Sequence, residues 1–172
     1  NHISYAFSAF LLYFKIIFQS TVTGMMMASR VLLLIGIVGF WKWIKFFYKD
    51  QPEWVYGLLT VFWAFSPYLL GMVTYTYPDY AMWCIIPLLT YELHAHRWIS
   101  TFWLALFFLF IKETALVTYI SLVAVLYVCE AVENKKVVHH ARKYGLILLP
   151  AAVWLFAYLK INHYNQNRFL SE

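Results

Sequence analysis

Residues Trp98–Cys129 read WISTFWLALFFLFIKETALVTYISLVAVLYVC, and this stretch is the clearest indication of the fold class. It is almost entirely aliphatic and aromatic, and it is broken once, by Lys112-Glu113-Thr114. One straight helix over such a length would extend about 48 Å, whereas the hydrocarbon core of a bilayer is about 30 Å thick. We therefore predict two apolar helices with a turn near Lys112–Thr114. The rest of the chain repeats this pattern of apolar runs and short polar breaks.

The composition indicates the same class of protein. Hydrophobic residues make up 63% of the 172 residues and charged residues 12%, and the mean hydropathy is +0.66. A soluble domain carries about 25% charged residues. The net charge of +5 comes largely from short basic loops, which is typical of membrane orientation and contact with membrane lipid rather than of nucleic-acid binding. We predict a multi-pass integral protein of a plasma, inner or ER-like membrane.

The predicted fold class is all-α, a polytopic transmembrane helix bundle of about six to seven membrane segments. The apolar segments are Tyr5–Phe18, Met25–Phe47, Trp54–Tyr75, Pro78–Tyr91, Trp98–Ile111, Ala115–Ala131 and Tyr144–Ile161. Several are shorter than the roughly 20 residues that a crossing needs, so some helices must tilt or rest on neighbours. Residues 1–172 form a single transmembrane helical domain, which we expect to be a fragment of a longer chain because it opens on Asn1 rather than Met.

The basic residues predict the topology. Positively charged loops stay on the cytoplasmic side of a membrane, and alternate loops of this chain carry the Lys and Arg clusters. The loops predicted to be cytoplasmic are Lys42–Glu53, His94–Arg97 and Glu133–Lys143. The opposite face then receives Ser20–Met25, Tyr77–Asp79, Lys112–Glu113 and the Asn162–Glu172 tail. We expect Glu92 and Glu130, at the cytoplasmic ends of their segments, to be solvated.

Asp79 and Lys112 are the main candidates for chemistry on the non-cytoplasmic face. Asp79 follows Pro78 where a new helix is expected, so its carboxylate suits the free N–H groups of a helix start. The alternative interpretation is a carboxylate that binds a divalent metal ion or positions a polar substrate. Lys112 and Glu113 are either snorkelling charges at an interfacial turn or a phosphate-binding cation with an acid beside it. We expect Asp79 and Lys112 to open toward one shared cavity.

Other residues have simpler interpretations. Arg30 heads the second apolar segment, where it either snorkels or contacts an anion. Gly36 and Gly39 are predicted to be positions of close helix packing. Cys84 and Cys129 lie inside apolar runs without metal-ligand spacing, so we interpret them as packed thiols.

The order of motifs resembles the membrane core of GT-C glycosyltransferases, of the protein O-mannosyltransferase and aminoarabinose-transferase type. The residues that carry the resemblance, within Phe7–Val128, are Ala28-Ser29-Arg30, Trp41-Lys42-Trp43, Ser66-Pro67-Tyr68, Tyr77-Pro78-Asp79, Tyr91-Glu92-Leu93 and Lys112-Glu113-Thr114. These motifs are short. The principal catalytic acid of this family, in its first external loop, has no match here and would fall upstream of Asn1.

The resemblance implies a site on the external face for a polyprenyl-phosphate-linked sugar donor. Asp79, Lys112 and Glu113 would be its catalytic residues in this chain, and Lys112 and Arg30 would contact the carrier phosphate. Asp79 would also be the ligand if a divalent metal ion takes part. The competing hypothesis is a non-catalytic accessory membrane subunit, held in a larger complex with other membrane subunits by its aromatic surface.

Overall fold

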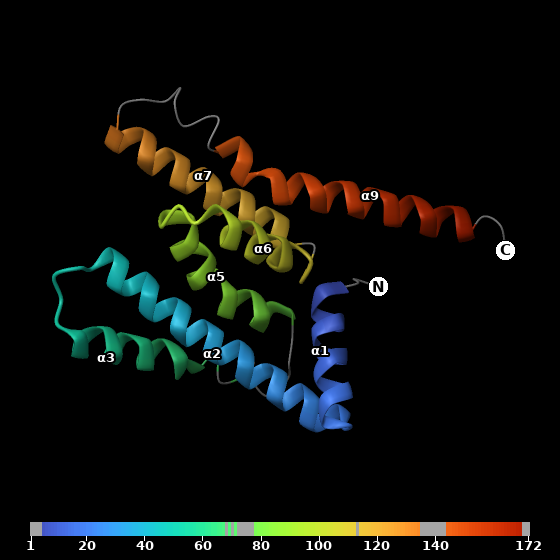
Figure 1. Cartoon of the computed structure of the whole chain (residues 1–172), viewed down its shortest axis with the longest axis horizontal. Coiled ribbons are helices and arrows are strands. Elements are labelled where there is room, and N and C mark those ends of the chain that lie inside the picture. Colours follow the sequence, from blue (N-terminus) through green and yellow to red (C-terminus); the bar gives the residue numbers. More distant parts are fainter. Residues whose placement is uncertain are drawn as a thin grey trace.

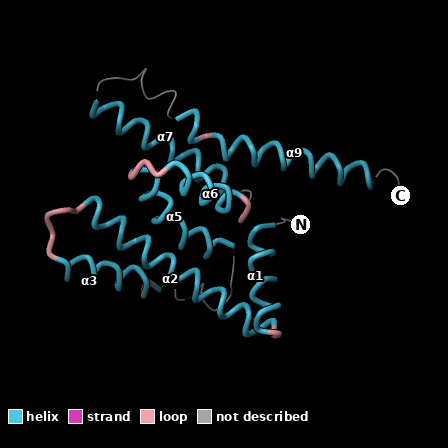
Figure 2. Tube along the Cα trace, viewed as in Figure 1, coloured by secondary structure: helices cyan, strands magenta, loops and turns pink. Residues whose placement is uncertain are grey.

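The computed structural model describes residues 5–67, 69, 71, 78–112, 114–134 and 144–169. All regular structure in these residues is helical, without a strand, so the prediction of an all-α fold is confirmed (Figures 1 and 2). The helices are α1 Tyr5–Phe18, α2 Thr21–Phe47, α3 Glu53–Ala64, α5 Pro78–His94, α6 Trp98–Leu109, α7 Ala115–Asn134 and α9 Leu149–Phe169.

Several polar breaks in the sequence fall where helices begin and end, although α3 ends at Ala64, inside the predicted apolar segment Trp54–Tyr75. Ser20 is the N-cap of α2, and its hydroxyl accepts a hydrogen bond from the Thr23 N–H at 3.3 Å, which satisfies one free donor of the first turn. α6 ends at Leu109 and α7 begins at Ala115. The predicted turn in the long apolar stretch is therefore confirmed.

The α2–α5 pair forms the centre of the fold. α1 and α3 also pack on α2. α6 packs on α5, and α7 and α9 pack on the other side of α6 (Figure 1). A Cβ added at Gly39 would lie 2.8 Å from the backbone N of Leu88, and one added at Gly36 would lie 3.1 Å from the Cα of Cys84. Both glycines allow α2 and α5 to approach closely, as the sequence predicted.

The buried residues come from most of the helices. They include Leu32, Tyr80, Leu89, Phe108 and Tyr119. Burying a phenol requires a partner for its hydroxyl. Tyr119 donates to the backbone carbonyl of Ile147 at 2.5 Å, and this hydrogen bond ties α7 to the helical turn before α9.

Two helical stretches, Thr21–Phe47 and Tyr144–Ile161, are long and apolar enough to cross a bilayer. Only 33% and 22% of their most apolar 18-residue windows are buried inside the protein, so most residues of these windows are at least partly exposed. This gives weak support for membrane association. The helix α6 has 12 residues and extends only about 18 Å. The prediction of six to seven membrane segments therefore stays a prediction.

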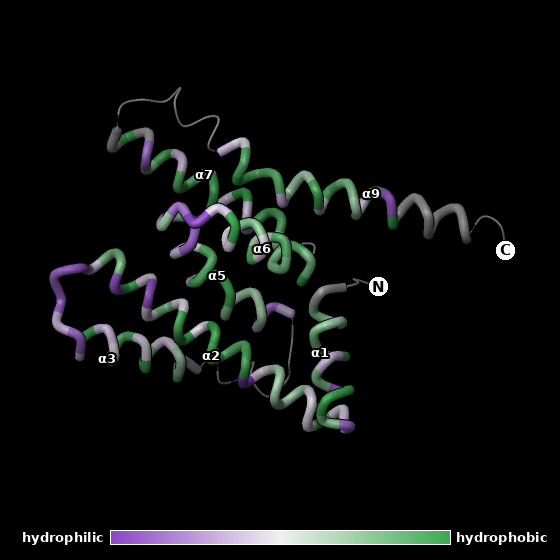
Figure 3. The backbone as a smooth tube through the Cα atoms, viewed as in Figure 1, coloured by the Kyte–Doolittle hydropathy of each residue, from purple (hydrophilic) through white to green (hydrophobic). Residues whose placement is uncertain are grey.

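The loops that follow α2 and α5 are polar and close to each other. The loops after α2 and after α5 lie at the same end of the bundle, on the left in Figure 3, where the tube is strongly hydrophilic. Ring contacts between Phe47 of α2 and His94 of α5, with centroids 4.7 Å apart, join these loops. Two of the three loops predicted to be cytoplasmic thus share one end. Most of the third, residues 135–143, lies outside the described residues.

Candidate functional site

Asp79 and Lys112 form an ion pair at the other end of α5. The ammonium of Lys112 lies 2.8 Å from Oδ1 and 3.0 Å from Oδ2 of Asp79, although the two residues are 33 positions apart in the chain. The side chain of Lys112 is 32% exposed, and that of Asp79 is 40% exposed. The pair is therefore formed at the edge of the bundle and remains open to solvent or to a ligand.

Local sequence explains how the Asp79 carboxylate is positioned. Pro78 is the first residue of α5, which suits the fixed φ of proline and its missing N–H. Asp79 then lies in the first turn, where the helix dipole stabilises a negative charge. The next residue, Tyr80, is fully buried, and its hydroxyl donates to the carbonyl of Ser29 in α2 at 3.0 Å. This hydrogen bond fixes the first turn of α5 against α2.

Lys112 reaches the carboxylate from the turn between α6 and α7. The residues on either side of this turn are anchored, since Ile111 and Ala115 are both fully buried. The N–H of Ala115 also donates to the carbonyl of Lys112 at 3.0 Å. Two anchored segments, the start of α5 and the α6–α7 turn, thus present opposite charges to each other.

Arg30 lies in the same region of α2, one residue after Ser29. It is exposed, and its guanidinium approaches Sδ of Met27 at 3.7 Å. Within the described residues it forms no ion pair, so its charge is available to an anion. No contact joins Arg30 directly to Asp79 or Lys112 in the described part of the chain. The structure brings two of the four predicted site residues into contact and leaves Arg30 nearby on α2.

Glu113, the fourth predicted site residue, lies outside the described residues. The metal interpretation of Asp79 finds no further ligands in the part of the chain that the structure describes. No group of three or more His, Cys, Asp or Glu side chains gathers there. Both carboxylate oxygens of Asp79 instead accept from Lys112. The described residues around Asp79 therefore do not by themselves form a metal site.

The expectation that Glu92 is solvated is wrong. Its side chain is only 8% exposed, and Oε2 accepts a hydrogen bond from the Ser100 hydroxyl at 2.5 Å. Oε1 also lies 3.7 Å from the guanidinium of Arg97. The short α5–α6 turn brings these partners over the carboxylate, and such tertiary proximity leaves no sign in the apolar periodicity of α5.

Asp79 can hold the ammonium of Lys112 in a fixed place. An ammonium has three N–H donors, and Asp79 takes two of them, so one donor of Lys112 remains for a ligand oxygen. Compared with known protein families, with curated proteins and with solved structures, the chain matches none. The features that indicate a function are therefore the geometry of this pair and its place in the bundle.

Proposed function

We propose that this chain is a multi-pass integral membrane protein and forms part of a GT-C-type glycosyltransferase that uses a polyprenyl-phosphate-linked sugar donor. The observation that carries the proposal is the ion pair between Asp79 and Lys112, two charges that the order of motifs assigns to one site. The pair lies at the end of α5 opposite the basic loops, which is the non-cytoplasmic end in the predicted topology.

In this proposal Lys112 contacts the phosphate of the lipid carrier. A fixed ammonium next to a leaving phosphate stabilises the negative charge that develops as the sugar is transferred. Asp79 holds the ammonium in place before the substrate binds. The pair alone is neutral, so the exposed Arg30 supplies the additional positive charge that an anionic donor requires. Glu113 belongs to the same proposal through its sequence position beside Lys112.

The second candidate function is a non-catalytic accessory membrane subunit. One observation favours it, because the Asp79–Lys112 pair joins α5 to the α6–α7 turn and has a structural role without any ligand. Large exposed apolar side chains such as Trp54 and Trp103 would then contact neighbouring subunits. The two functions make different predictions for a variant that lacks the Lys112 charge.

The test is sugar transfer from a polyprenyl-phosphate donor by the full-length protein in liposomes. Lys112→Ala should lower turnover by about 10²–10³-fold, the effect of removing one stabilising group from a transition state. Lys112→Arg should recover part of the activity because it keeps the positive charge. The matched control is Lys45→Ala, which removes a lysine that is also paired with an acid, Glu53, at the basic end.

The transferase proposal predicts that Lys45→Ala keeps its activity. It fails if the protein consumes no such donor, or if folded Lys112→Ala protein transfers sugar at the normal rate. An accessory subunit would show no turnover of its own, and Lys112→Ala would change assembly with its partners or nothing.

A further inference from the structure

At the basic end, two cations from different elements approach one aromatic ring. The ammonium of Lys42 in α2 and the guanidinium of Arg97 in the α5–α6 turn each lie 5.7 Å from the ring centre of Tyr91 in α5. Lys42 is exposed, and the Arg97 side chain is 57% exposed. A cation is attracted to a ring face by its charge and does not need its N–H groups for this contact. Both side chains therefore keep hydrogen-bond donors for an anion.

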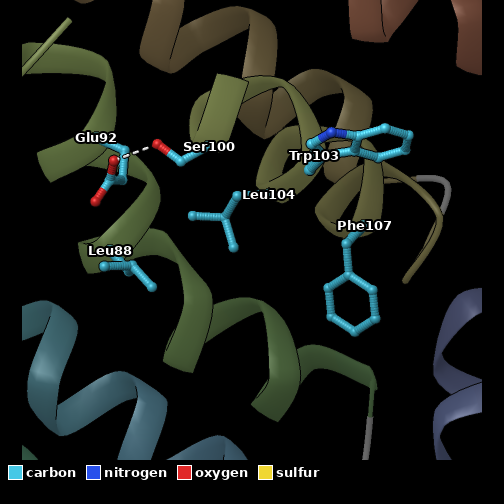
Figure 4. Close-up of a pocket in the computed structure, with 6 residues that line it drawn as sticks. All are labelled: Leu88, Glu92, Ser100, Trp103, Leu104 and Phe107. Atoms are coloured by element: carbon cyan, nitrogen blue, oxygen red, sulfur yellow. Dashed lines mark hydrogen bonds between the residues drawn. The ribbon is translucent and has the colours of Figure 1, made fainter. Parts of the chain in front are cut away.

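An open apolar groove begins beside this cluster, between α5 and α6. Its volume is about 420 Å³, and its lining residues are Leu88, Glu92, Ser100, Trp103, Leu104 and Phe107. Figure 4 shows the hydrogen-bonded pair of Glu92 and Ser100 at one end of the groove and the apolar side chains along the rest of it. The carboxylate and the hydroxyl of the groove therefore lie at the end nearest Arg97, whose guanidinium lies 3.7 Å from Glu92.

The charges next to Tyr91 and the groove favour an anion. Lys42 and Arg97 contribute two positive charges, and Glu92 contributes one negative charge that is buried and hydrogen-bonded to Ser100. One positive charge is left over, which matches a phosphodiester. Anionic phospholipids are concentrated in the cytoplasmic leaflet, which is where the predicted topology places these residues.

We propose that an anionic phospholipid binds here, with its phosphate between Lys42 and Arg97 and one acyl chain in the groove between α5 and α6. The phosphate takes the donors that the two cations offer beside the Tyr91 ring. The acyl chain covers Leu104, Trp103 and Phe107, which the helices leave exposed or half-buried. This lipid site lies at the opposite end of α5 from Asp79, so it is independent of the proposed transferase chemistry.

The experiment counts the lipids that stay bound to the purified full chain by native mass spectrometry. Phosphatidylglycerol and phosphatidylcholine with the same acyl chains are added separately. Each basic residue near anionic lipid strengthens binding by about fivefold. The double variant Lys42→Gln/Arg97→Gln should therefore bind phosphatidylglycerol about 30-fold more weakly and lose its preference over phosphatidylcholine. A second variant, Leu104→Trp, fills the groove and should weaken binding of both lipids.

The charge control is Lys45→Gln/Lys49→Gln, which removes the same number of positive charges from the same end. It should reduce phosphatidylglycerol binding much less, because Lys45 pairs with Glu53 and Lys49 lies over the ring of Phe46 rather than over Tyr91 in the described structure. Equal losses in the two double variants would overturn the site, since only the overall charge would then matter. The proposal also fails if Leu104→Trp binds both lipids normally. It fails again if that variant changes only the oligomeric mass, because the groove would then hold another protein segment.

Discussion

The hydroxyl of Tyr80 donates a hydrogen bond to the backbone carbonyl of Ser29 across 3.0 Å, and both residues are buried. The bond joins α5 to α2 at the turn where Asp79 precedes Tyr80 and Arg30 follows Ser29. Two charged residues of the candidate site are thus held on neighbouring helices by the buried residues next to them. This arrangement makes Tyr80 a positioning residue for the Asp79–Lys112 pair.

We expect Tyr80→Phe to destabilise the protein by about 1 kcal/mol, the net contribution of one buried hydrogen bond. In a chain of this size, such a loss lowers the Tm by about 2–4 °C. Thermal unfolding in detergent measures it. The matched control is Tyr158→Phe, since no hydrogen bond of the Tyr158 hydroxyl is present in the described structure. Equal unfolding temperatures for wild type and Tyr80→Phe would show that the bond does not contribute.

Exchanging the charges separates the structural role of the ion pair from its chemical role. Asp79→Lys or Lys112→Asp alone should cost up to about 1 kcal/mol, as for other partly exposed pairs, because like charges then face each other. The double variant restores the attraction between the two residues, but it leaves a positive charge in the first turn of α5, so it should recover only part of that stability. Sugar transfer should stay low in the double variant, because the cation now lies on α5 and the carboxylate on the turn. Recovery of both stability and transfer would contradict a directed phosphate contact by Lys112.

The close approach of α2 and α5 predicts a large effect of one methyl group. A Cβ at Gly39 would lie 2.7 Å from Cβ of Leu88 and 2.8 Å from its backbone N, and the backbone cannot easily move away. Gly39→Ala should destabilise the protein by about 1–3 kcal/mol, as overpacking does in cores. Gly145→Ala is the control, because its new Cβ would meet nothing within 4 Å. Chemical denaturation of the two variants in detergent makes the comparison, and a neutral Gly39→Ala would show that the helices separate readily.

The sequence predicts the helices well because apolar runs and polar breaks determine them locally. Examples are Tyr5–Phe18, which matches α1 at both ends, and the turn near Lys112. It also names Asp79 and Lys112 as separate candidates. Their direct ion pair could not be predicted, since it depends on how α5 packs against the α6–α7 turn. Charge type and spacing do not contain that information.

Other contacts could not be predicted from the sequence for the same reason. Glu92 looks solvated in sequence because it ends an apolar segment, yet Ser100 folds back over it from the next helix. Tyr91 lies in an aromatic-rich run like many others, and only the packing brings Lys42 and Arg97 to its ring. One observable sign was the shortness of the turn after His94, which forces the start of α6 to lie beside the end of α5.

The two ends of α5 should face opposite sides of a membrane. α5 has 17 residues and extends about 25 Å, with Asp79 in its first turn and His94 in its last. The basic end should be cytoplasmic, because Lys and Arg are retained there during insertion. Two exposed positions report on the ends: Asp50 in the α2–α3 turn and Thr114 after Lys112.

Single cysteines at these positions provide the measurement, after the exposed Cys129 is replaced by serine. In intact cells a membrane-impermeant maleimide should label Thr114→Cys and not Asp50→Cys. Inside-out vesicles should give the reverse result. The control carries no introduced cysteine and should stay unlabelled, because Cys84 is buried. Labelling of both positions from the same side would show that α5 does not separate the two faces, and the proposed site for a donor on the external face would be lost with it.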